Sequence, residues 1–386
     1  MTHLPHLSGE RFSGAAYCRA RQRLPLEVIR RIVDSFSHGI ARSDPVSSWH
    51  GHRVALIDGT GFSMPDTPEL QAHFGQPGGQ RPGCGFPVAH MLALFDAETG
   101  VLHDVVIAPL RTHDLAHAAK LHPKLASGDI IVGDRAFCSY AHLALLSQAE
   151  LHGVLRVHQR RIVDFHPHRP CARDTAGKGL PQSRWVKRLG KCDQLVKWFK
   201  PESPPKWMTR EAFDNLPEEL LVREIRCRIS DRTSRVHEVT LVTTLLDPER
   251  YPANEIADLY RMRWQVEVDL RDLKCTLGMD VLKGKKVETV LKEAHLFTLV
   301  YNLVRLVVVE AARRQRVRPD RISFIDALRW LQPAKPRTPL PPLVTNPTRP
   351  GRLEPRCRKR RPKQYPLMKV PRHELRKRLK KQRDAA

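Results

Sequence analysis

Hydrophobic positions along the 386-residue chain follow two spacings, one typical of amphipathic helices and one typical of buried strands. Residues 10–45 have the helical spacing, with apolar side chains at Leu26, Ile29 and Val33, and Pro25 stands where a helix can begin. We therefore expect a small helical segment at the start of the chain.

Short apolar runs that end in an acidic residue mark two strands, one leading into Asp58 and one into Asp134. Around them strands and helices alternate in the order strand, strand, strand, helix, strand, helix, strand. Such an order predicts a mixed α/β sheet rather than an all-parallel one. The expected elements are strands at 54–60, 90–95, 101–110, 129–134 and 153–157, and helices at 114–126 and 139–150.

The pattern changes in the second half of the chain. Residues 160–250 are basic and rich in proline, with strand patterns at 221–229 and 236–246, and they predict a β-rich insertion. Helical patterns return at 254–277 and 287–316.

The excess of basic over acidic residues indicates the kind of partner that the protein binds. The chain carries 66 Lys and Arg against 41 Asp and Glu, a formal charge of +25, which favours a polyanion such as DNA, RNA or an anionic membrane. The longest apolar stretch, 295–309, contains Asn302 and Arg305 and is shorter than the ~20 residues of a membrane span, so it predicts a buried helix and no membrane partner. From residue 351 onward, fifteen Lys and Arg against three acids predict a flexible basic arm. Its charge density favours binding to a DNA backbone over the alternative, an ordinary solvated run of charges.

Export signals and cysteine motifs are missing from the sequence. The N-terminus has no basic start followed by an apolar run, which indicates a cytoplasmic protein. The eight cysteines form no C-x-x-C pair, so we expect reduced thiols and neither a zinc knuckle nor a disulfide framework.

One helical segment gathers groups that suit a metal held beside phosphates. At about 100° per residue, Tyr260, Arg263, Glu267 and Lys274 fall within an arc of roughly 60°. This face combines an aromatic ring, two cations and one carboxylate. A solvated salt-bridge face, with Glu267 and Arg271 as an i, i+4 pair, explains the segment about equally well.

The two strand-ending aspartates supply the other carboxylates that such a site needs. Phosphodiester cleavage uses two divalent ions about 3.5–4 Å apart, and three carboxylates suffice when water and phosphate complete the coordination. An acid at the end of a buried strand is desolvated unless it binds something. For Asp58, which precedes a glycine, an ordinary turn is the alternative interpretation.

The signature spacing in this chain is Y-x2-R-x3-E-x6-K, which resembles that of DDE transposases of the insertion-sequence-four type. The resemblance covers roughly residues 15–370. The signature positions are Tyr260, Arg263, Glu267 and Lys274, and the segments 20–25, 57–60, 133–137 and 292–305 are similar to further motifs of the family, including both aspartate motifs.

This resemblance implies a fold, a metal site and a reaction. It implies a ribonuclease H-like core with a β-rich insertion between the second aspartate and the glutamate. A metal-activated water would free a 3′ hydroxyl at the element's end, and that hydroxyl would then attack target DNA. The implied metal ligands and catalytic residues are Asp58, Asp134 and Glu267, holding Mg2+ or Mn2+ as two ions, and the implied DNA-binding residues are Tyr260, Arg263 and Lys274.

The implied partners are double-stranded DNA, at the transposon ends and at the target, and a second copy of the chain in a homodimer assembled on paired ends. Such a protein would be associated with the nucleoid. The expected parts of the chain are a helical N-terminal segment (1–50), the first part of the core (51–160), the insertion (161–250), the second part of the core with the glutamate helix (251–316) and a basic C-terminal region (317–386).

Two rival functions use the same residues. About 57 residues precede Asp58, fewer than members of the family usually carry, so a truncated and inactive DNA-binding remnant is one alternative. The other is a ribonuclease H-like nuclease that cuts without joining, and only strand-transfer products distinguish it from a transposase.

Weaker signals have ordinary explanations. Two histidine groups have part of a zinc-binding set, but surface or loop positions explain them better. Three tryptophans lie in the basic insertion, where aromatic rings can stack on unpaired bases, although burial in a core is the commoner role. These residues are His113 with His117, His166 and His168 with Cys171, and Trp185, Trp198 and Trp207.

Overall fold

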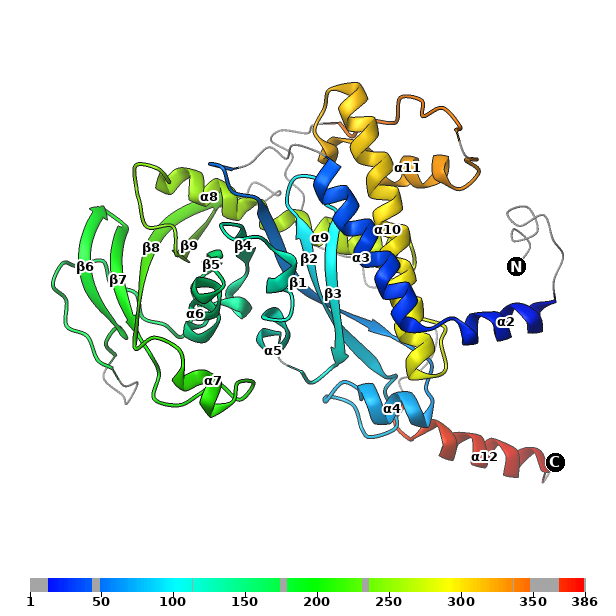
Figure 1. Ribbon diagram of the computed structural model, residues 1–386. Helices are drawn as coiled ribbons and strands as arrows, with labels where there is room; N and C mark the ends of the chain where they lie inside the picture. The colour runs from blue at the N-terminus through cyan, green and yellow to red at the C-terminus, as the bar shows by residue number, and fades with distance from the viewer. Residues whose placement is uncertain are drawn as a thin grey trace.

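Nine strands form one mixed sheet (Figure 1). They are seen in the computed structural model, which describes residues 13–43, 49–112, 114–173, 179–230, 236–335, 337–347 and 368–384. Two groups of buried hydrophobic residues flank the sheet, one on each face. The sheet is therefore covered by helices on both sides and carries the core of the protein.

The first five strands form one half of the sheet. Their order is β3-β2-β1-β4-β5, with β2 antiparallel to β1 and β3, and with β4 parallel to both β1 and β5. This is the arrangement of a ribonuclease H-like core, and the expected mixed α/β fold is confirmed. The strands are β1 (Val54–Ser63), β2 (Val88–Asp96), β3 (Leu102–Pro109), β4 (Ile130–Gly133) and β5 (His152–Arg156).

The β-rich insertion continues this sheet instead of building a second one. Its strand β9 (Val236–Thr243) pairs antiparallel with β5, and the sheet then runs outward through β8, β7 and β6. The sequence did not predict the positions of the strands β6 and β7. For β6 the reason is that it is an edge strand with mostly polar and charged side chains, which lack the apolar pattern of a buried strand. The remaining elements are β6 (Ser183–Gly190), β7 (Asp193–Phe199), α7 (Arg210–Asp214) and β8 (Glu219–Ser230).

The helices on the two faces differ in what they cover. One face packs against α8, α9 and α10, and the other packs against α5 and α6. The helix expected at 114–126 is shorter, because only α5 and the 3-10 turn η1 (His122–Lys124) form there. The helices are α2 (Gly14–Arg23), α3 (Leu26–Ser43), α4 (Pro68–Phe74), α5 (Leu115–Ala118), α6 (Tyr140–Gln148), α8 (Ala253–Arg261), α9 (Arg263–Arg271), α10 (Val287–Gln315) and α11 (Phe324–Leu331).

The apolar helix α10 is part of the core. It is long and apolar enough to cross a membrane, yet half of its most apolar window is buried inside the protein. Asn302 on α10 donates to the Ser37 hydroxyl of α3 and accepts from the Leu102 backbone amide of β3. This helix therefore ties the N-terminal helices to the sheet, as expected of a buried helix.

The segment expected to be one helix over 254–277 is divided. It consists of α8, a break at Met262, the helix α9 and a π-helical turn at Asp272–Thr276. A π turn changes the rotation per residue, so the arc calculated for a continuous α-helix does not hold as far as Lys274.

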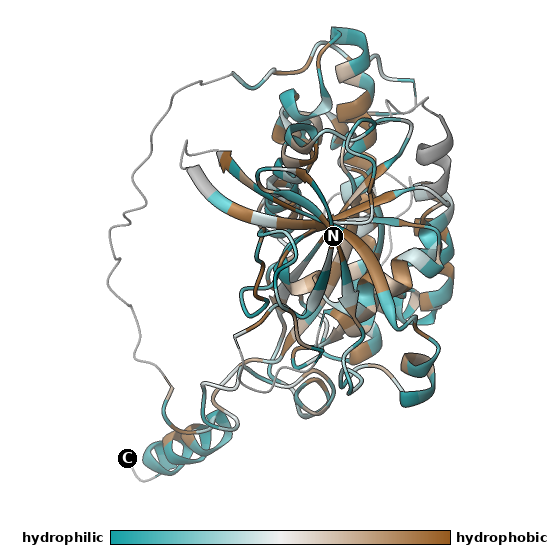
Figure 2. Ribbon diagram, turned by 90° about the vertical axis from the view of Figure 1, so that its left-hand side faces the viewer, coloured by the Kyte–Doolittle hydropathy of each residue, from teal (hydrophilic) through white to brown (hydrophobic). Residues whose placement is uncertain are grey.

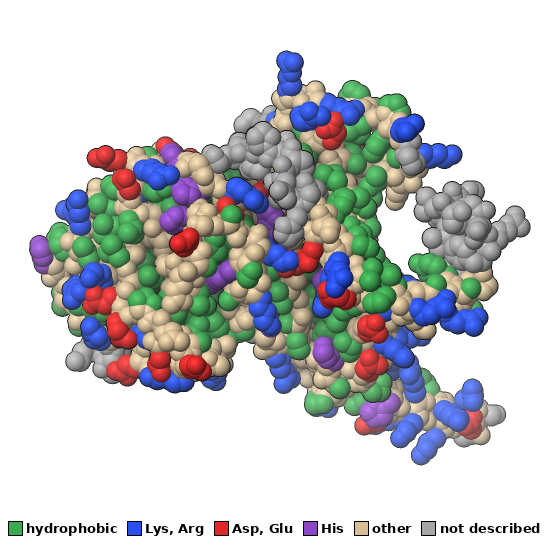
Figure 3. Space-filling model, in the orientation of Figure 1, with side chains coloured by type: hydrophobic (Ala, Val, Ile, Leu, Met, Phe, Trp, Pro, Cys, Tyr) green, Lys and Arg blue, Asp and Glu red, His purple; other side chains and the backbone are tan. Residues whose placement is uncertain are grey.

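Basic residues dominate the helix near the C-terminus. Helix α12 (Arg372–Asp384) carries seven Lys and Arg and has no buried residue, and it stands out as a hydrophilic helix in Figure 2 and as a group of basic side chains in Figure 3. The flexible arm expected for the tail is thus a helix over these residues. Its first residue, Arg372, contacts Asp66 at 3.8 Å and lies over the Phe86 ring at 4.5 Å.

Candidate active site

Asp58 and Asp134 lie side by side on adjacent parallel strands. The register of β1 and β4 pairs Leu56 with Val132, and continuing it by two residues puts Asp58 opposite Asp134. Leu56 and Val132 both belong to the core that packs against α8, α9 and α10. Because alternate residues of a strand face the same side, both aspartates point toward these helices.

Local backbone contacts fix each aspartate. The Asp58 carboxylate accepts from the Gly59 amide at 2.8 Å, and the Asp134 carboxylate accepts from the Ala136 amide at 2.7 Å. The second contact caps the 3-10 turn η2 (Arg135–Phe137). At Gly59 a Cβ would stand 2.8 Å from the His90 ring, which explains why glycine follows the first aspartate.

The third predicted carboxylate comes from helix α9. Glu267 is 57% exposed and pairs with the guanidinium of Arg263 at 3.3 Å. Arg263 itself is 13% exposed, and its Nε is buried without a hydrogen-bond partner among the described residues. Such a donor is costly to leave unpaired, so it is available to an acceptor that enters the site.

The charges of these groups act on Asp58. Burial raises the pKa of Asp58 to about 6, while the Gly59 amide and the Arg263 charge lower it and the charges of Asp134 and Glu267 raise it. The structure thus brings together Asp58, Asp134, Glu267 and Arg263.

Tyr260 joins the same site from the end of α8. Its ring is buried, and burial raises the pKa of its hydroxyl, while the charges of Arg263 and Arg156 lower that pKa and the charge of Asp134 raises it. The tyrosine is therefore close to the second aspartate. Lys274 lies beyond α9 in the π turn and is half-buried.

Arg156 is a site residue that the sequence did not suggest. The register of β4 and β5 pairs Gly133 with Leu155, so Asp134 stands opposite Arg156, the last residue of β5. Asp58, Asp134 and Arg156 form one row across three parallel strands. The available signal was an arginine ending an apolar strand, just as the aspartates do.

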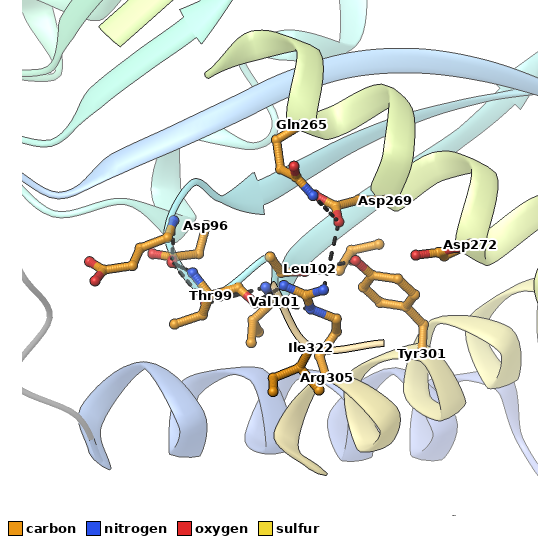
Figure 4. Close-up of polar contacts among 12 residues, drawn as sticks. Asp96, Thr99, Val101, Leu102, Gln265, Asp269, Asp272, Tyr301, Arg305 and Ile322 are labelled. Atoms are coloured by element: carbon orange, nitrogen blue, oxygen red, sulfur yellow. Dashed lines mark hydrogen bonds and ion pairs between the residues drawn. The ribbon is translucent and has the colours of Figure 1, made fainter. Parts of the chain in front are cut away.

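Helix α9 is held in place by a buried ion pair on its other side (Figure 4). Asp269 is fully buried and lies 3.9 Å from the Arg305 guanidinium of α10. Arg305 also donates to the carbonyl of Thr99 at 2.9 Å, in the turn between β2 and β3. Burial raises the pKa of Asp269 to about 6, and Arg305 opposes this shift. The glutamate helix is thereby tied to the hairpin of the central sheet.

The weaker sequence signals do not assemble into sites. Among the described residues, no three His, Cys, Asp or Glu side chains are arranged to hold a metal ion, and His113 lies outside them. Trp198 is buried and donates to Glu224 at 2.8 Å, so it is a core residue. Trp185 lies against His168, with ring centroids 4.5 Å apart, and the cysteines of the described part are free. Trp207 packs against the core of the α5 and α6 face.

Comparison with known proteins gives a consistent set of relatives. A family model for the transposase DDE domain matches residues 49–303. Transposase InsG of insertion sequence element IS4 from Escherichia coli K12 is 28% identical over 372 residues, which cover 91% of this chain and 78% of InsG. The putative transposase InsZ of the same strain is 30% identical over 140 residues, covering 35% of this chain and 46% of InsZ.

One solved structure extends the comparison. A piggyBac transposase in a synaptic complex with hairpin DNA is 13% identical with a TM-score of 0.43, and the match covers 83% of this chain. The chain spans 59% of that transposase, less than two thirds of its length.

Proposed function

The chain belongs to the transposase DDE-domain family, whose members cut DNA and transfer the cut strand, and on that premise we propose that Asp58, Asp134 and Glu267 are its catalytic residues. In this proposal the protein is the transposase of an insertion sequence. It frees a 3′ hydroxyl at the element's end and joins that hydroxyl to target DNA.

The observation that carries the residue assignment is the register of β1 and β4. It puts Asp58 opposite Asp134 on the face where α9 presents Glu267. Strand ends and a packed helix are rigid supports, and catalytic groups need such supports to hold a productive geometry. If the two aspartates were ordinary turn residues, nothing would require their side chains to lie on the same face of the sheet.

The donor set suits hard divalent cations. Among the described residues the three carboxylates do not yet form a metal-binding set, but Asp58 and Asp134 stand opposite each other in the continued register of β1 and β4. Burial raises the pKa of Asp58, and the charges of Asp134 and Glu267 add to this rise, so a cation at this position would be favoured. Glu267 is turned toward Arg263, so it has to rotate away to complete a ligand set with the aspartates. Two Mg2+ or Mn2+ ions held by these residues would activate the attacking oxygen and stabilise the leaving one.

The neighbouring residues bind and orient the DNA in this proposal. Arg263 has a buried Nε free to donate to a phosphate oxygen, and its fork geometry suits bidentate contact. When a phosphate takes that guanidinium, Glu267 is released from its ion pair. Tyr260, whose hydroxyl is within range of the Asp134 charge, is assigned a further phosphate contact. Lys274 is assigned a phosphate contact as a point charge, although the π turn separates it from the other three.

The proposed function also implies the binding partners of the protein and its location in the cell. Two copies of the chain would assemble on paired DNA ends, and the charge of +25 supports binding to double-stranded DNA in the nucleoid of the cytoplasm.

The test is a strand-transfer reaction with purified protein. Its substrate is a duplex that carries the inverted repeat flanking the gene, mixed with a supercoiled plasmid and Mg2+. Joined products that disappear with Asp134→Asn support the proposal. Cleavage without joining supports the nuclease alternative. DNA binding without cleavage supports the inactive remnant.

A further inference from the structure

A small basic pocket adjoins the catalytic row on the side of the insertion. It has a cavity volume of about 180 Å3 and is formed by the end of β5, the loop that follows it and the strands β8 and β9. This volume suits a group of a few heavy atoms. The lining side chains that matter here are Arg135, Arg156, Arg161, Arg226 and Glu238.

The pocket has more positive charge than it uses internally. Four arginines and one glutamate line it, and the charge of the buried Glu224 acts on one of the four, Arg161. Among the described residues, no ion pair of 4.0 Å or less joins Arg135, Arg156 or Arg226 to an acid. A cluster of unpaired guanidinium groups is costly at close range unless an anion occupies it.

Aromatic rings and polar side chains hold the guanidinium groups in place. Arg161 lies over the Trp198 ring at 3.6 Å, and Arg226 lies over the Phe165 ring at 4.9 Å. Arg135 donates to the Gln159 amide oxygen at 2.7 Å. Preordered arginines lose less side-chain freedom when they bind a ligand, so the pocket is prepared for an anion with several acceptor oxygens.

Two of these arginines connect the pocket to the active site. Arg156 stands opposite Asp134 in the continued register of β4 and β5, and Arg135 directly follows Asp134 in the chain. The pocket therefore begins beside the catalytic row, at Arg156 and Arg135. Arg226 lies on the opposite face of the sheet, the face of Glu224 and Trp198, so a DNA strand that joins the two places has to pass the end of β5.

We propose that this pocket binds a backbone phosphate of the DNA being cut, within a few nucleotides of the scissile bond. The proposal rests on the proposed function and adds a second anchoring point to it. Arg226 comes from the insertion and Arg135 from the core, so one phosphate held between them fixes the DNA relative to both parts. An acidic side chain of another protein is the competing occupant, and it predicts no effect on DNA.

The experiment compares three variants with the wild type. Arg226→Gln removes one pocket charge, Arg226→Lys keeps the charge, and Arg188→Gln removes an equal charge from the exposed edge strand β6 of the same sheet. Binding of a fluorescent duplex with the element's terminal sequence is titrated with salt. Arg135→Gln, at an exposed position, is the second pocket variant if Arg226→Gln lowers the thermal midpoint.

Loss of one phosphate contact is expected to weaken binding by roughly tenfold, with a salt slope shallower by about 0.9. Arg226→Gln and Arg135→Gln should show this loss, Arg226→Lys should retain most of the slope, and Arg188→Gln should match the wild type. A wild-type slope in both pocket variants, or the same loss in Arg188→Gln, overturns the proposal while leaving the proposed function intact. If the wild type neither binds nor cuts the terminal duplex, the proposed function itself fails.

A scan with uncharged phosphates locates the contact. Single methylphosphonate substitutions along the terminal duplex should weaken wild-type binding at one position near the cleavage site, and Arg226→Gln should be insensitive there. Equal sensitivity of both proteins at every position contradicts the pocket as a phosphate site.

Discussion

Asp58 and Asp134 stand at the same level on two neighbouring parallel strands, two residues beyond the last register pair, Leu56 with Val132. Their carboxylates share one face of the sheet, and the charge of Asp134 helps to raise the pKa of Asp58 there. This relationship brings two separate sequence motifs together at one place in the fold.

We expect Asp58→Ala, Asp134→Ala and Glu267→Ala each to abolish Mg2+-dependent cleavage by at least about a thousandfold while DNA affinity changes little. Each change removes an expected metal ligand and no DNA contact. Cleavage of the terminal duplex and its binding are measured in parallel. The double variants should be no worse than the single ones, because the three residues act as a unit. Retained cleavage in any single variant would remove that residue from the site.

Replacing Tyr260, Arg263 or Lys274 with alanine should weaken engagement of DNA while metal binding persists. Arg263 should have the largest effect, because its buried Nε lacks a partner. Cleavage at limiting DNA reports the loss, and calorimetry with Mn2+ is the control. If Lys274→Ala removed Mn2+ binding, the division between ligands and phosphate contacts would be wrong.

Asp58→Asn should stabilise the metal-free protein at neutral pH. Burial raises the pKa of Asp58 in the folded protein from its ordinary value of 3.8 to about 6, so the contribution of this group to stability is fully present below pH 3.8 and is lost as the pH rises through about 6. At pH 8 this ionisation costs up to about 3 kcal/mol, at about 1.4 kcal/mol per pKa unit. Thermal midpoints in chelator at pH 5 and pH 8 test this: the gain in Asp58→Asn should grow with pH. If Asp58→Asn raised the thermal midpoint equally at pH 5 and at pH 8, the prediction would be wrong.

Arg305→Met should lower the free energy of unfolding by about 3–5 kcal/mol, because it leaves the fully buried Asp269 carboxylate without its cation. Adding Asp269→Asn should recover part of the loss, since the uncompensated charge is then gone. Urea unfolding of the single and double variants measures both effects. Glu310→Gln, on the same helix but in partly exposed ion pairs with Arg313 and Arg314, is the control and should cost at most about 1 kcal/mol. Additive losses in the double variant would show that the two residues do not interact.

Removing residues 351–386 should lower DNA affinity without regard to sequence. Helix α12 in this tail carries seven basic residues, of which six are exposed and Arg372 is half-buried. If four of them contact the backbone, the salt slope should become shallower by about 3–4. Cleavage at saturating DNA in low salt should survive, because the carboxylates are untouched. Salt titrations of the full-length and truncated proteins on terminal and random duplexes decide this. Equal slopes for the two proteins would show that the tail does not contact DNA. A loss of affinity for only one of the duplexes would show that the tail contacts bases specifically.

The sequence alone determined the elements whose signal is local. A continuous apolar run of this length is typical of a strand that is covered on both faces of a sheet. The strands that lead to Asp58 and Asp134 were therefore predictable from hydrophobicity. The mixed order of strands and helices also followed, as did the signature positions Tyr260, Arg263 and Glu267. Residue type and spacing were enough for these because each depends only on near neighbours in the chain.

The tertiary structure alone decided which residues meet across the sheet. The register between β1, β4 and β5 is set by packing on both faces, and no local pattern encodes it, so Arg156 entered the site unpredicted. The break at Met262 and the π turn at Asp272–Thr276 could not be predicted for the same reason, because the helical periodicity of the sequence continues through both. The position of α9 is fixed instead by the buried ion pair of Asp269 and Arg305. Long-range packing, which a one-dimensional pattern does not record, made these choices.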